Sequence, residues 1–218
     1  MNFVYISPQF PKNFYHFCES LKNNGVNVLG IGDTPYDQLS PELKASLTEY
    51  YKVNTLESLD EKIRAIGYFI HRYGKIDWLE SNNEYWLESD AKLRTEFNIT
   101  TGMMVDHIND FKEKSAMKAF YEKAGVPTAR YHLVQGQEDA KAFIEKVGYP
   151  VVVKPDNGVG AAATYKLRSD ADLENFLASK IDVQYIMEEF VNGTIETYDG
   201  IVDLDNEVVF ETSHLFPE

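Results

Sequence analysis

The stretch at residues 149–163, YPVVVKPDNGVGAAA, decides which fold this chain is expected to adopt. Its apolar run, residues 151–153, indicates a buried strand, and the strand ends on Lys154 before a loop that contains Gly158, Gly160 and three alanines. Small residues let backbone N–H groups approach an anion closely, and a lysine supplies a point charge from the adjoining strand. The stretch therefore predicts a phosphate-binding loop. The alternative is a strand that ends in a surface lysine and a flexible turn.

Two common nucleotide-binding loops do not fit this stretch. A Walker A loop needs Gly-Lys-Ser/Thr, and no such tripeptide follows the glycines here. The Rossmann fingerprint G-x-G-x-x-G belongs in the first strand-to-helix turn, where residues 7–12 read SPQFPK. That loop is unsuited to close approach of a pyrophosphate, so a redox protein holding a dinucleotide is a disfavoured alternative.

The residues around the loop predict a small α+β unit. The expected strands are 131–134, 151–154, 164–167 and 183–188, and the expected helices are 138–147 and 170–179. Two further alternating stretches, 197–204 and 207–213, are joined through Asp205 and Asn206, which tolerate left-handed turn geometry. These two stretches predict a β-hairpin.

Residues 1–108 predict a separate α/β domain built on a parallel sheet. An apolar strand at 3–7, an amphipathic helix at 13–24 and a second strand at 26–31 form a β-α-β unit. A helix at 58–73, a strand at 76–81 and a helix at 84–97 continue this pattern. The amphipathic stretch 109–127 stops at Gly125 and Pro127 and is expected to be a linking helix.

Composition indicates a cytoplasmic protein with neither a nucleic-acid partner nor a membrane partner. The chain has 218 residues, of which 44% are hydrophobic, so it can bury a sizeable core. A net charge of -14 repels polyphosphate backbones and anionic lipid surfaces. Cys18 is the only cysteine, which excludes an internal disulfide, and the N-terminus lacks the pattern of a signal peptide.

Four motifs occur in a fixed order between residues 112 and 193. A lysine before a helix, Lys114, is followed by Ala-Gly-Val-Pro at 124–127, by Lys154 with its glycine loop, and by MEEFVNG at 187–193. This ordered set resembles the ATP-grasp superfamily of carboxylate–amine or carboxylate–thiol ligases, in particular carbamoyl-phosphate synthase large-subunit-like and D-alanine–D-alanine-ligase-like proteins. The resemblance implies a Rossmann-like pre-ATP-grasp domain at 1–108, a linking helix at 109–127, an ATP-grasp lid subdomain at 128–190, and the first strands of an antiparallel C-terminal subdomain at 191–218.

The resemblance also implies ATP as cofactor and assigns residues to it. Lys114 and Lys154 would contact the phosphates, and the loop at 157–164 would close over them. The residues implied to bind ATP are Lys114, Lys154, Asn157, Gly158, Gly160, Ala161, Ala162, Glu188, Glu189, Val191 and Glu196, with Glu188, Glu189 and Val191 at the adenine edge. Only the register against 124–127 selects Lys114 over Lys112, and any lysine of this polar helix is ordinarily a solvated charge.

The sequence departs from the family pattern at the ribose and at the metal. The family's ribose glutamate comes two residues after the hinge glycine, but Ile195 stands there, so Glu196 is the candidate, with Asp199 or Asp203 as alternatives. Nothing in 205–218 resembles the family's acidic pair for Mg²⁺, since Glu211 alone cannot make a two-metal site. No metal ligand is therefore assigned, the Mg²⁺ ligands are expected downstream of residue 218, and the chain is expected to be a C-terminally truncated fragment that is inactive alone.

The expected substrates are a small-molecule carboxylate and an amine. Asn83 and Glu84 follow the strand at 76–81, at the edge of the sheet where ligands of open α/β folds gather, and are the substrate-binding candidates. The alternative is that Asn82 or Asn83 caps the helix that follows. The implied reaction converts the carboxylate to an acyl phosphate that the amine captures, and no catalytic side chain is assigned. A non-catalytic nucleotide-binding protein is the second hypothesis, and a homodimer is possible under either.

Overall fold

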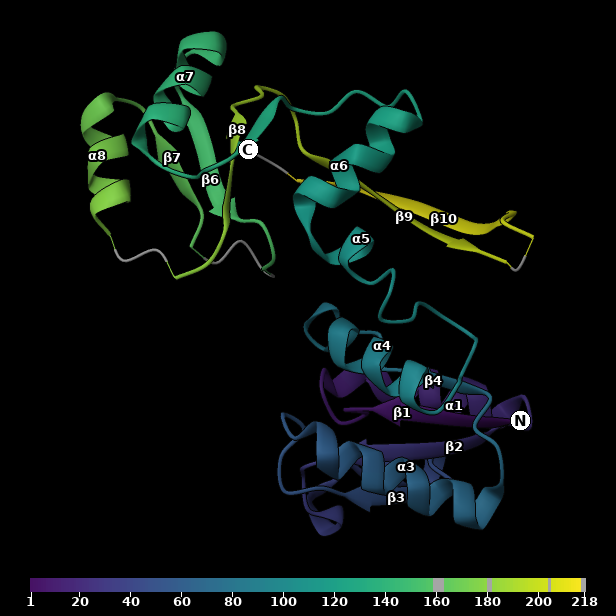
Figure 1. Cartoon of the computed structure of the whole chain (residues 1–218). Helices are drawn as coiled ribbons and strands as arrows, with labels where there is room; N and C mark the ends of the chain where they lie inside the picture. The colour runs from purple at the N-terminus through teal and green to yellow at the C-terminus, as the bar shows by residue number, and fades with distance from the viewer. Residues whose placement is uncertain (159–162, 180–181, 204, 217–218) are drawn as a thin grey trace. The chain divides into compact units, whose positions relative to one another are not determined.

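The computed structural model describes residues 1–158, 163–179, 182–203 and 205–216. They form two compact units, which are described separately (Figure 1). The first unit is Met1–Val126 together with residues 156–158, and the second is Pro127–Pro155 together with the described residues from 163 onward. Candidate site residues occur in both units.

The first unit is built on a parallel four-stranded sheet in the order β3-β2-β1-β4. Its strands are β1 (Asn2–Ile6), β2 (Asn27–Gly32), β3 (Glu49–Lys52) and β4 (Trp78–Glu80). Its helices are η1 (Lys12–Phe14), α1 (Tyr15–Asn23), η2 (Tyr36–Gln38), α2 (Pro41–Ser46), α3 (Leu59–Tyr73), η3 (Glu84–Trp86) and α4 (Leu87–Glu96). The β-α-β arrangement predicted for 1–108 is therefore present. The sequence patterns predicted no element between 32 and 57, where α2 and β3 lie.

Alternation along β1 explains how this sheet is buried on both faces. Val4 and Ile6 pack against α3, α4 and the segment around Ile99, in one apolar cluster. Phe3 and Tyr5 point to the opposite face and pack against α1 and α2. Figure 1 shows α3 and α4 on the same side of the sheet. A sheet covered in this way has continuous apolar strands, as residues 3–6 show.

The prediction of a single linking helix at 109–127 is wrong in one respect, because the structure has two helices in this segment. Helix α5 (Asn109–Lys112) and helix α6 (Lys114–Lys123) are separated by Glu113, whose φ of -88° and ψ of 123° are extended. The extended conformation lets Glu113 form an antiparallel bridge with Asn157. Helix α6 ends where Gly125 takes up φ +71°, a left-handed conformation that glycine adopts without strain.

The second unit contains an antiparallel sheet in the order β5-β8-β6-β7. Its strands are β5 (Tyr131–Leu133), β6 (Val151–Pro155), β7 (Tyr165–Leu167) and β8 (Tyr185–Glu189), with helices α7 (Gln137–Val147) and α8 (Asp170–Ala178). Val151, Val153 and Met187 pack with residues of both helices in one core. The helices therefore cover a single face of the sheet (Figure 1).

A β-hairpin completes the described part of the second unit. Strands β9 (Glu196–Val202) and β10 (Val208–Leu215) pair antiparallel, with a register shift between Val208 and Phe210. Asn206 adopts φ +63° in the connection, as the predicted turn requires. The structure thus has the predicted mixed α/β class, with a parallel sheet first, an α+β unit second and an antiparallel hairpin last.

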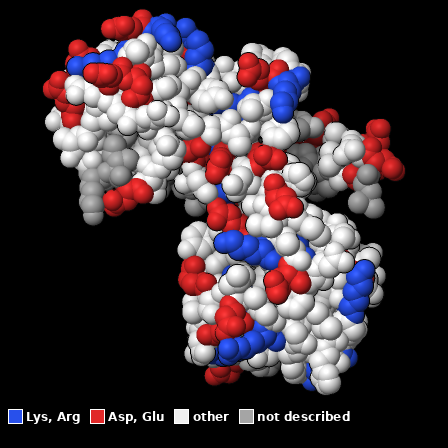
Figure 2. Space-filling view, viewed as in Figure 1, with Lys and Arg blue, Asp and Glu red and all other residues white. Residues whose placement is uncertain are grey.

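Charged side chains are scattered over the face drawn in Figure 2, where Asp and Glu lie among Lys and Arg. The whole chain has 35 acidic and 21 basic residues, so side chains of both signs are expected at the surface. Within the residues that the structure describes, no helix has the length and apolar character to cross a bilayer.

Candidate functional site

Lys154 and Glu188 lie together on the face of the second unit's sheet that α7 and α8 do not cover. Lys154 is on β6 and Glu188 is on the neighbouring strand β8. Register places Val152 opposite Glu188, and because Lys154 is two residues beyond Val152 it shares that face. Nζ of Lys154 lies 2.6 Å from Oε2 of Glu188, and the two side chains are 27% and 11% exposed. This ion pair is thus largely shielded from water.

Lys166 on β7 belongs to the same face and was not predicted from the sequence. It lies opposite Val152 in the register of β6 and β7. Its Nζ lies 3.2 Å from the ring centroid of Phe190, which follows β8 in the predicted adenine segment. Cation and ring attract one another through the ring's quadrupole. Only strand register brings Lys166 beside this segment, so a single sequence gives no direct signal for it.

Glu189 points to the face opposite that of Glu188. Its carboxylate accepts hydrogen bonds from the backbone N–H and from Nε of Arg130, both at 2.7 Å, and forms an ion pair with Nη2 at 2.6 Å. The backbone N–H of Glu189 also donates to the Arg130 carbonyl. The two glutamates of the motif thus have different surroundings. Val191, the next predicted adenine contact, is exposed.

Lys114 lies in the first unit, at the first position of α6. Its Nζ donates to the carbonyl oxygens of Asp156 at 3.2 Å and of Gly158 at 3.0 Å. Asn157 donates from Nδ2 to Oε1 of Glu88 at 2.7 Å. The structure therefore brings Lys114 together with the first residues of the predicted phosphate loop. Gly160, Ala161 and Ala162 lie outside the described residues.

Lys112, the alternative to Lys114, has a different environment. It is buried, and its Nζ donates to the carbonyl oxygen of Glu84 at 2.9 Å. That contact holds α5 against η3 and does not involve the loop. Of these two lysines, Lys114 is the one that contacts residues 156–158.

The ribose candidates all lie on the β9–β10 hairpin. Glu196 begins β9 and is exposed, and Asp199 is three residues further on, on the opposite face of the strand. Oδ2 of Asp199 lies 3.3 Å from Nδ1 of His214, and Oδ1 of Asp203 accepts from the backbone N–H groups of Asp205 and Glu207. These two hydrogen bonds give the Asp203 carboxylate a structural role in the turn between β9 and β10.

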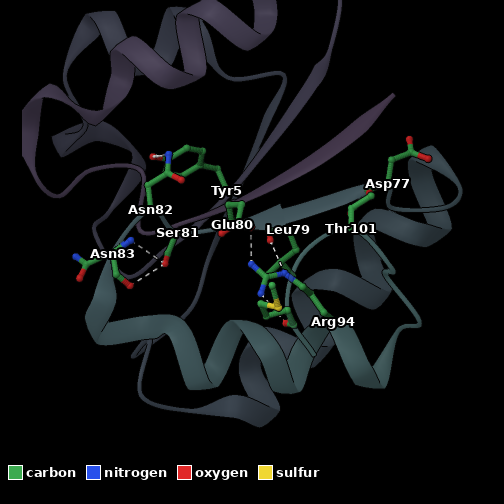
Figure 3. A network of polar contacts seen from close by, with 10 residues as sticks. Tyr5, Asp77, Leu79, Glu80, Ser81, Asn82, Asn83, Arg94 and Thr101 are labelled. Atoms are coloured by element: carbon green, nitrogen blue, oxygen red, sulfur yellow. Dashed lines mark hydrogen bonds and ion pairs between the residues drawn. The ribbon is translucent and has the colours of Figure 1, made fainter. Parts of the chain in front are cut away.

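Asn83 lies in the turn after β4 and Glu84 is the first residue of η3, and Asn83 acts as the N-cap of this helix. Its Oδ1 accepts from the backbone N–H of Tyr85 at 3.0 Å at the start of η3. The neighbouring Asn82 adopts φ +52° and donates from Nδ2 to the hydroxyl of Tyr5 at 3.1 Å (Figure 3). The amide oxygen of Asn83 therefore has a partner within the protein. This is the helix-capping role that the sequence left open as an alternative to substrate binding.

A buried polar network lies behind this turn. Arg94 donates to the carbonyl oxygens of Leu79 at 3.0 Å and Met103 at 2.9 Å, and its Nη2 lies 2.6 Å from Oε1 of Glu80 (Figure 3). Burial raises the pKa of Glu80, although Arg94 acts to lower it. Asp90 is completely buried, and burial raises its pKa to about 6 despite the opposing influence of the Ser81 hydroxyl. Through its contacts with Leu79, Glu80 and Met103, Arg94 anchors the segment after α4 to β4.

A metal centre is not formed by the residues that the structure describes. No group of three or more His, Cys, Asp or Glu side chains in 1–158, 163–179, 182–203 and 205–216 is placed to hold an ion. Three carboxylates of the hairpin have other partners: Asp199 lies beside His214, Glu211 accepts from the Tyr198 hydroxyl, and Asp203 accepts from backbone amides. No magnesium ligand is assigned to any of them.

Comparison with known proteins identifies the class of domain. Residues 119–203 match the family model of the ATP-grasp domain, so the predicted resemblance to the ATP-grasp superfamily is confirmed. The match includes both Lys154 and Glu188, the two residues paired on the open face of the sheet.

Individual relatives are ATP-grasp ligases and related enzymes. The chain is 24% identical over 197 residues to the carbamoyl phosphate synthase large chain of Methanothermobacter thermautotrophicus, covering 87% of this chain and 17% of that protein. It is 33% identical over 84 residues to D-alanine–D-alanine ligase B of Clostridium perfringens, covering 37% of this chain and 28% of the relative. The biotin carboxylase domain of the Hydrogenobacter thermophilus 2-oxoglutarate carboxylase superposes with a TM-score of 0.71 at 19% identity, over 90% of this chain and 46% of that one. The chain therefore spans only part of each of these relatives.

Proposed function

We propose that this chain is the ATP-binding part of an ATP-dependent ligase that joins a carboxylate to an amine or a thiol. The observation that carries the proposal is the position of Lys154. It is the second-to-last residue of strand β6, on the face of the sheet that α7 and α8 do not cover, and it is paired with Glu188 of the predicted adenine segment. The similarity to ATP-grasp ligases supports the same conclusion.

The proposed reaction has two steps. A carboxylate oxygen attacks the γ-phosphorus of ATP, the bond from that phosphorus to the β,γ-bridging oxygen breaks, and ADP leaves. The amine nitrogen then attacks the acyl carbon of the acyl phosphate, inorganic phosphate leaves, and the amine loses a proton. Such transfer depends on positioning and on neutralising phosphoryl charge rather than on covalent catalysis by side chains. This explains why no nucleophilic side chain has to be assigned.

Each candidate residue has a proposed role in holding ATP. Lys154 and Lys114 supply positive charge to the phosphates, and residues 157–158 begin the loop that covers them. Glu188 accepts from the adenine amino group, whereas Glu189 and Val191 contribute through the backbone, since the Glu189 carboxylate already binds Arg130. Glu196 remains the candidate for the ribose hydroxyls. Asn83 and Glu84 remain candidates for the acceptor substrate.

Magnesium is proposed for the whole enzyme and not for any described residue. The Hydrogenobacter thermophilus biotin carboxylase domain is a dimer in complex with MgADP, and on this basis we propose a nucleotide-bound magnesium ion and a homodimer for this protein. In the part of the chain that the structure covers, no metal cluster is present. When bound, the ion would screen the charge of the transferred phosphoryl group.

Calorimetric titration with ATP, with and without magnesium, tests the proposal. We expect saturable binding at one site and weaker binding of GTP, because GTP carries a carbonyl where adenine presents an amino group to Glu188. A folded chain that binds neither nucleotide would overturn the proposal. Release of ADP by the whole enzyme, of which this chain is proposed to be the ATP-binding part, on addition of carboxylate and amine mixtures would then separate a ligase from a nucleotide-binding protein without catalysis.

A further inference from the structure

Asp156 joins the start of helix α6 to the segment that follows β6. Its Oδ1 accepts from the backbone N–H of Ser115 at 2.8 Å, and its Oδ2 accepts from the Ser115 hydroxyl at 2.6 Å. Its carbonyl oxygen accepts from the backbone N–H of Lys114 at 3.1 Å. Asp156 is only 4% exposed, so these bonds are shielded from water.

These contacts give α6 a cap that its own N-terminal residue does not provide. The first amides of a helix have no partner within the helix and need an acceptor from elsewhere. Glu113 occupies the N-cap position, but its side chain makes no capping hydrogen bond. Asp156, which is 41 residues away from Ser115 in sequence, accepts in its place. A carboxylate at this end also complements the helix dipole.

The same segment holds the ammonium group of Lys114. Nζ donates to the carbonyl oxygens of Asp156 and Gly158, while Glu113 pairs with Asn157 as an antiparallel bridge. Backbone and side chain of Lys114 are therefore both fixed by residues 156–158. Without the Asp156 carboxylate, the first turn of α6 would lose its cap, and only backbone carbonyl oxygens of residues 156–158 would hold Lys114 at the start of that turn.

We propose that Asp156 is a positioning residue, which sets Lys114 against the start of the phosphate loop by capping α6. This inference rests on the proposed ATP-binding function. It assigns a task to Asp156 and Ser115, neither of which stands out as a ligand in the sequence. Asp156 acts through Lys114, so its effect on ATP should depend on the presence of that lysine.

A double-mutant cycle on the full chain tests the dependence. We expect Lys114→Ala and Asp156→Ala each to weaken ATP binding by tenfold or more, and the double variant to be no weaker than Lys114→Ala alone. Asp156→Asn should restore most of the affinity, because its amide oxygen accepts from the Ser115 N–H and its amide nitrogen can donate to the Ser115 hydroxyl. Additive losses, or an Asp156→Ala variant with wild-type affinity, would overturn the proposal.

Amide hydrogen exchange separates failure of this inference from failure of the proposed function. The backbone amide of Ser115, which donates to the Asp156 carboxylate, should exchange faster in Asp156→Ala than in the wild type, and at close to the wild-type rate in Asp156→Asn. Unchanged exchange in Asp156→Ala would show that Asp156 does not hold the helix start, whatever the chain binds. A wild-type chain that fails to bind ATP would instead overturn the proposed function, with the exchange result still deciding whether Asp156 fixes Lys114.

Discussion

Nζ of Lys154 lies 2.6 Å from Oε2 of Glu188, across two neighbouring strands of an antiparallel sheet. The pair joins the residue expected to contact phosphate to the residue expected to contact adenine. The ion pair holds the two side chains in place in the structure, which contains no ligand. Preorganisation of this kind lowers the ordering cost of binding.

Loss of the lysine should destabilise the second unit. Lys154→Met removes the cation that faces Glu188 in a shielded position, at an expected cost of about 1–3 kcal/mol in the free energy of unfolding. Urea denaturation followed by far-UV circular dichroism measures it. Lys166→Met is a matched control, since it removes an exposed cation over Phe190 and should cost at most ~1 kcal/mol. A larger cost for the control would contradict the assignment.

Asp90 should make the first unit less stable as the pH rises. Its pKa is raised to about 6 from 3.8 by burial, so the folded state binds the proton more tightly than the unfolded state does. The resulting stability is complete below about pH 4 and is lost as the pH rises through about 6. Integrated over the shift, the loss approaches about 3 kcal/mol.

Asp90→Asn isolates this contribution from those of other groups. Glu49, whose pKa is lowered, acts in the opposite direction and is left unchanged by the substitution. Tryptophan fluorescence reports on the first unit, because Trp78 and Trp86 are the only tryptophans of the chain and both lie there. The free energy of unfolding of Asp90→Asn, relative to that of the wild type, should be higher at pH 7.5 than at pH 4. An equal difference at both pH values would contradict the raised pKa.

The segment after α4 should tolerate no side chain at Gly102. Gly102 has φ +102°, and a Cβ there would lie 2.8 Å from Nε of the buried Arg94. Gly102→Ala should therefore cost about 1–3 kcal/mol. Gly67→Ala in α3 is the matched control, since its added Cβ meets nothing within 4 Å, and it should stabilise the chain by about 0.5–1 kcal/mol. Thermal unfolding of both variants measures these changes in stability. Equal changes for the two variants would contradict the steric argument.

Sequence patterns predicted most of the elements, because continuous apolar runs and apolar positions at helical spacing leave little choice of structure. The strand at 151–154 and the helix at 58–73 are examples, and the structure has β6 at Val151–Pro155 and α3 at Leu59–Tyr73. The break at Glu113 could not be predicted, since it depends on a bridge to Asn157, which lies far away in sequence. Likewise, the opposite orientations of Glu188 and Glu189 follow from the strand period, but the partner of each comes from tertiary structure. The binding roles of the site residues remain predictions.

ATP binding by the intact chain and by Lys154→Ala tests the central claim most directly. Calorimetry with magnesium present should show saturable binding that Lys154→Ala weakens by tenfold or more, which corresponds to about 1.4 kcal/mol. Lys146→Ala is the control, because Lys146 lies on α7 and is exposed away from the proposed site. Its affinity should equal that of the wild type. Equal affinities for the wild type and Lys154→Ala would contradict the account.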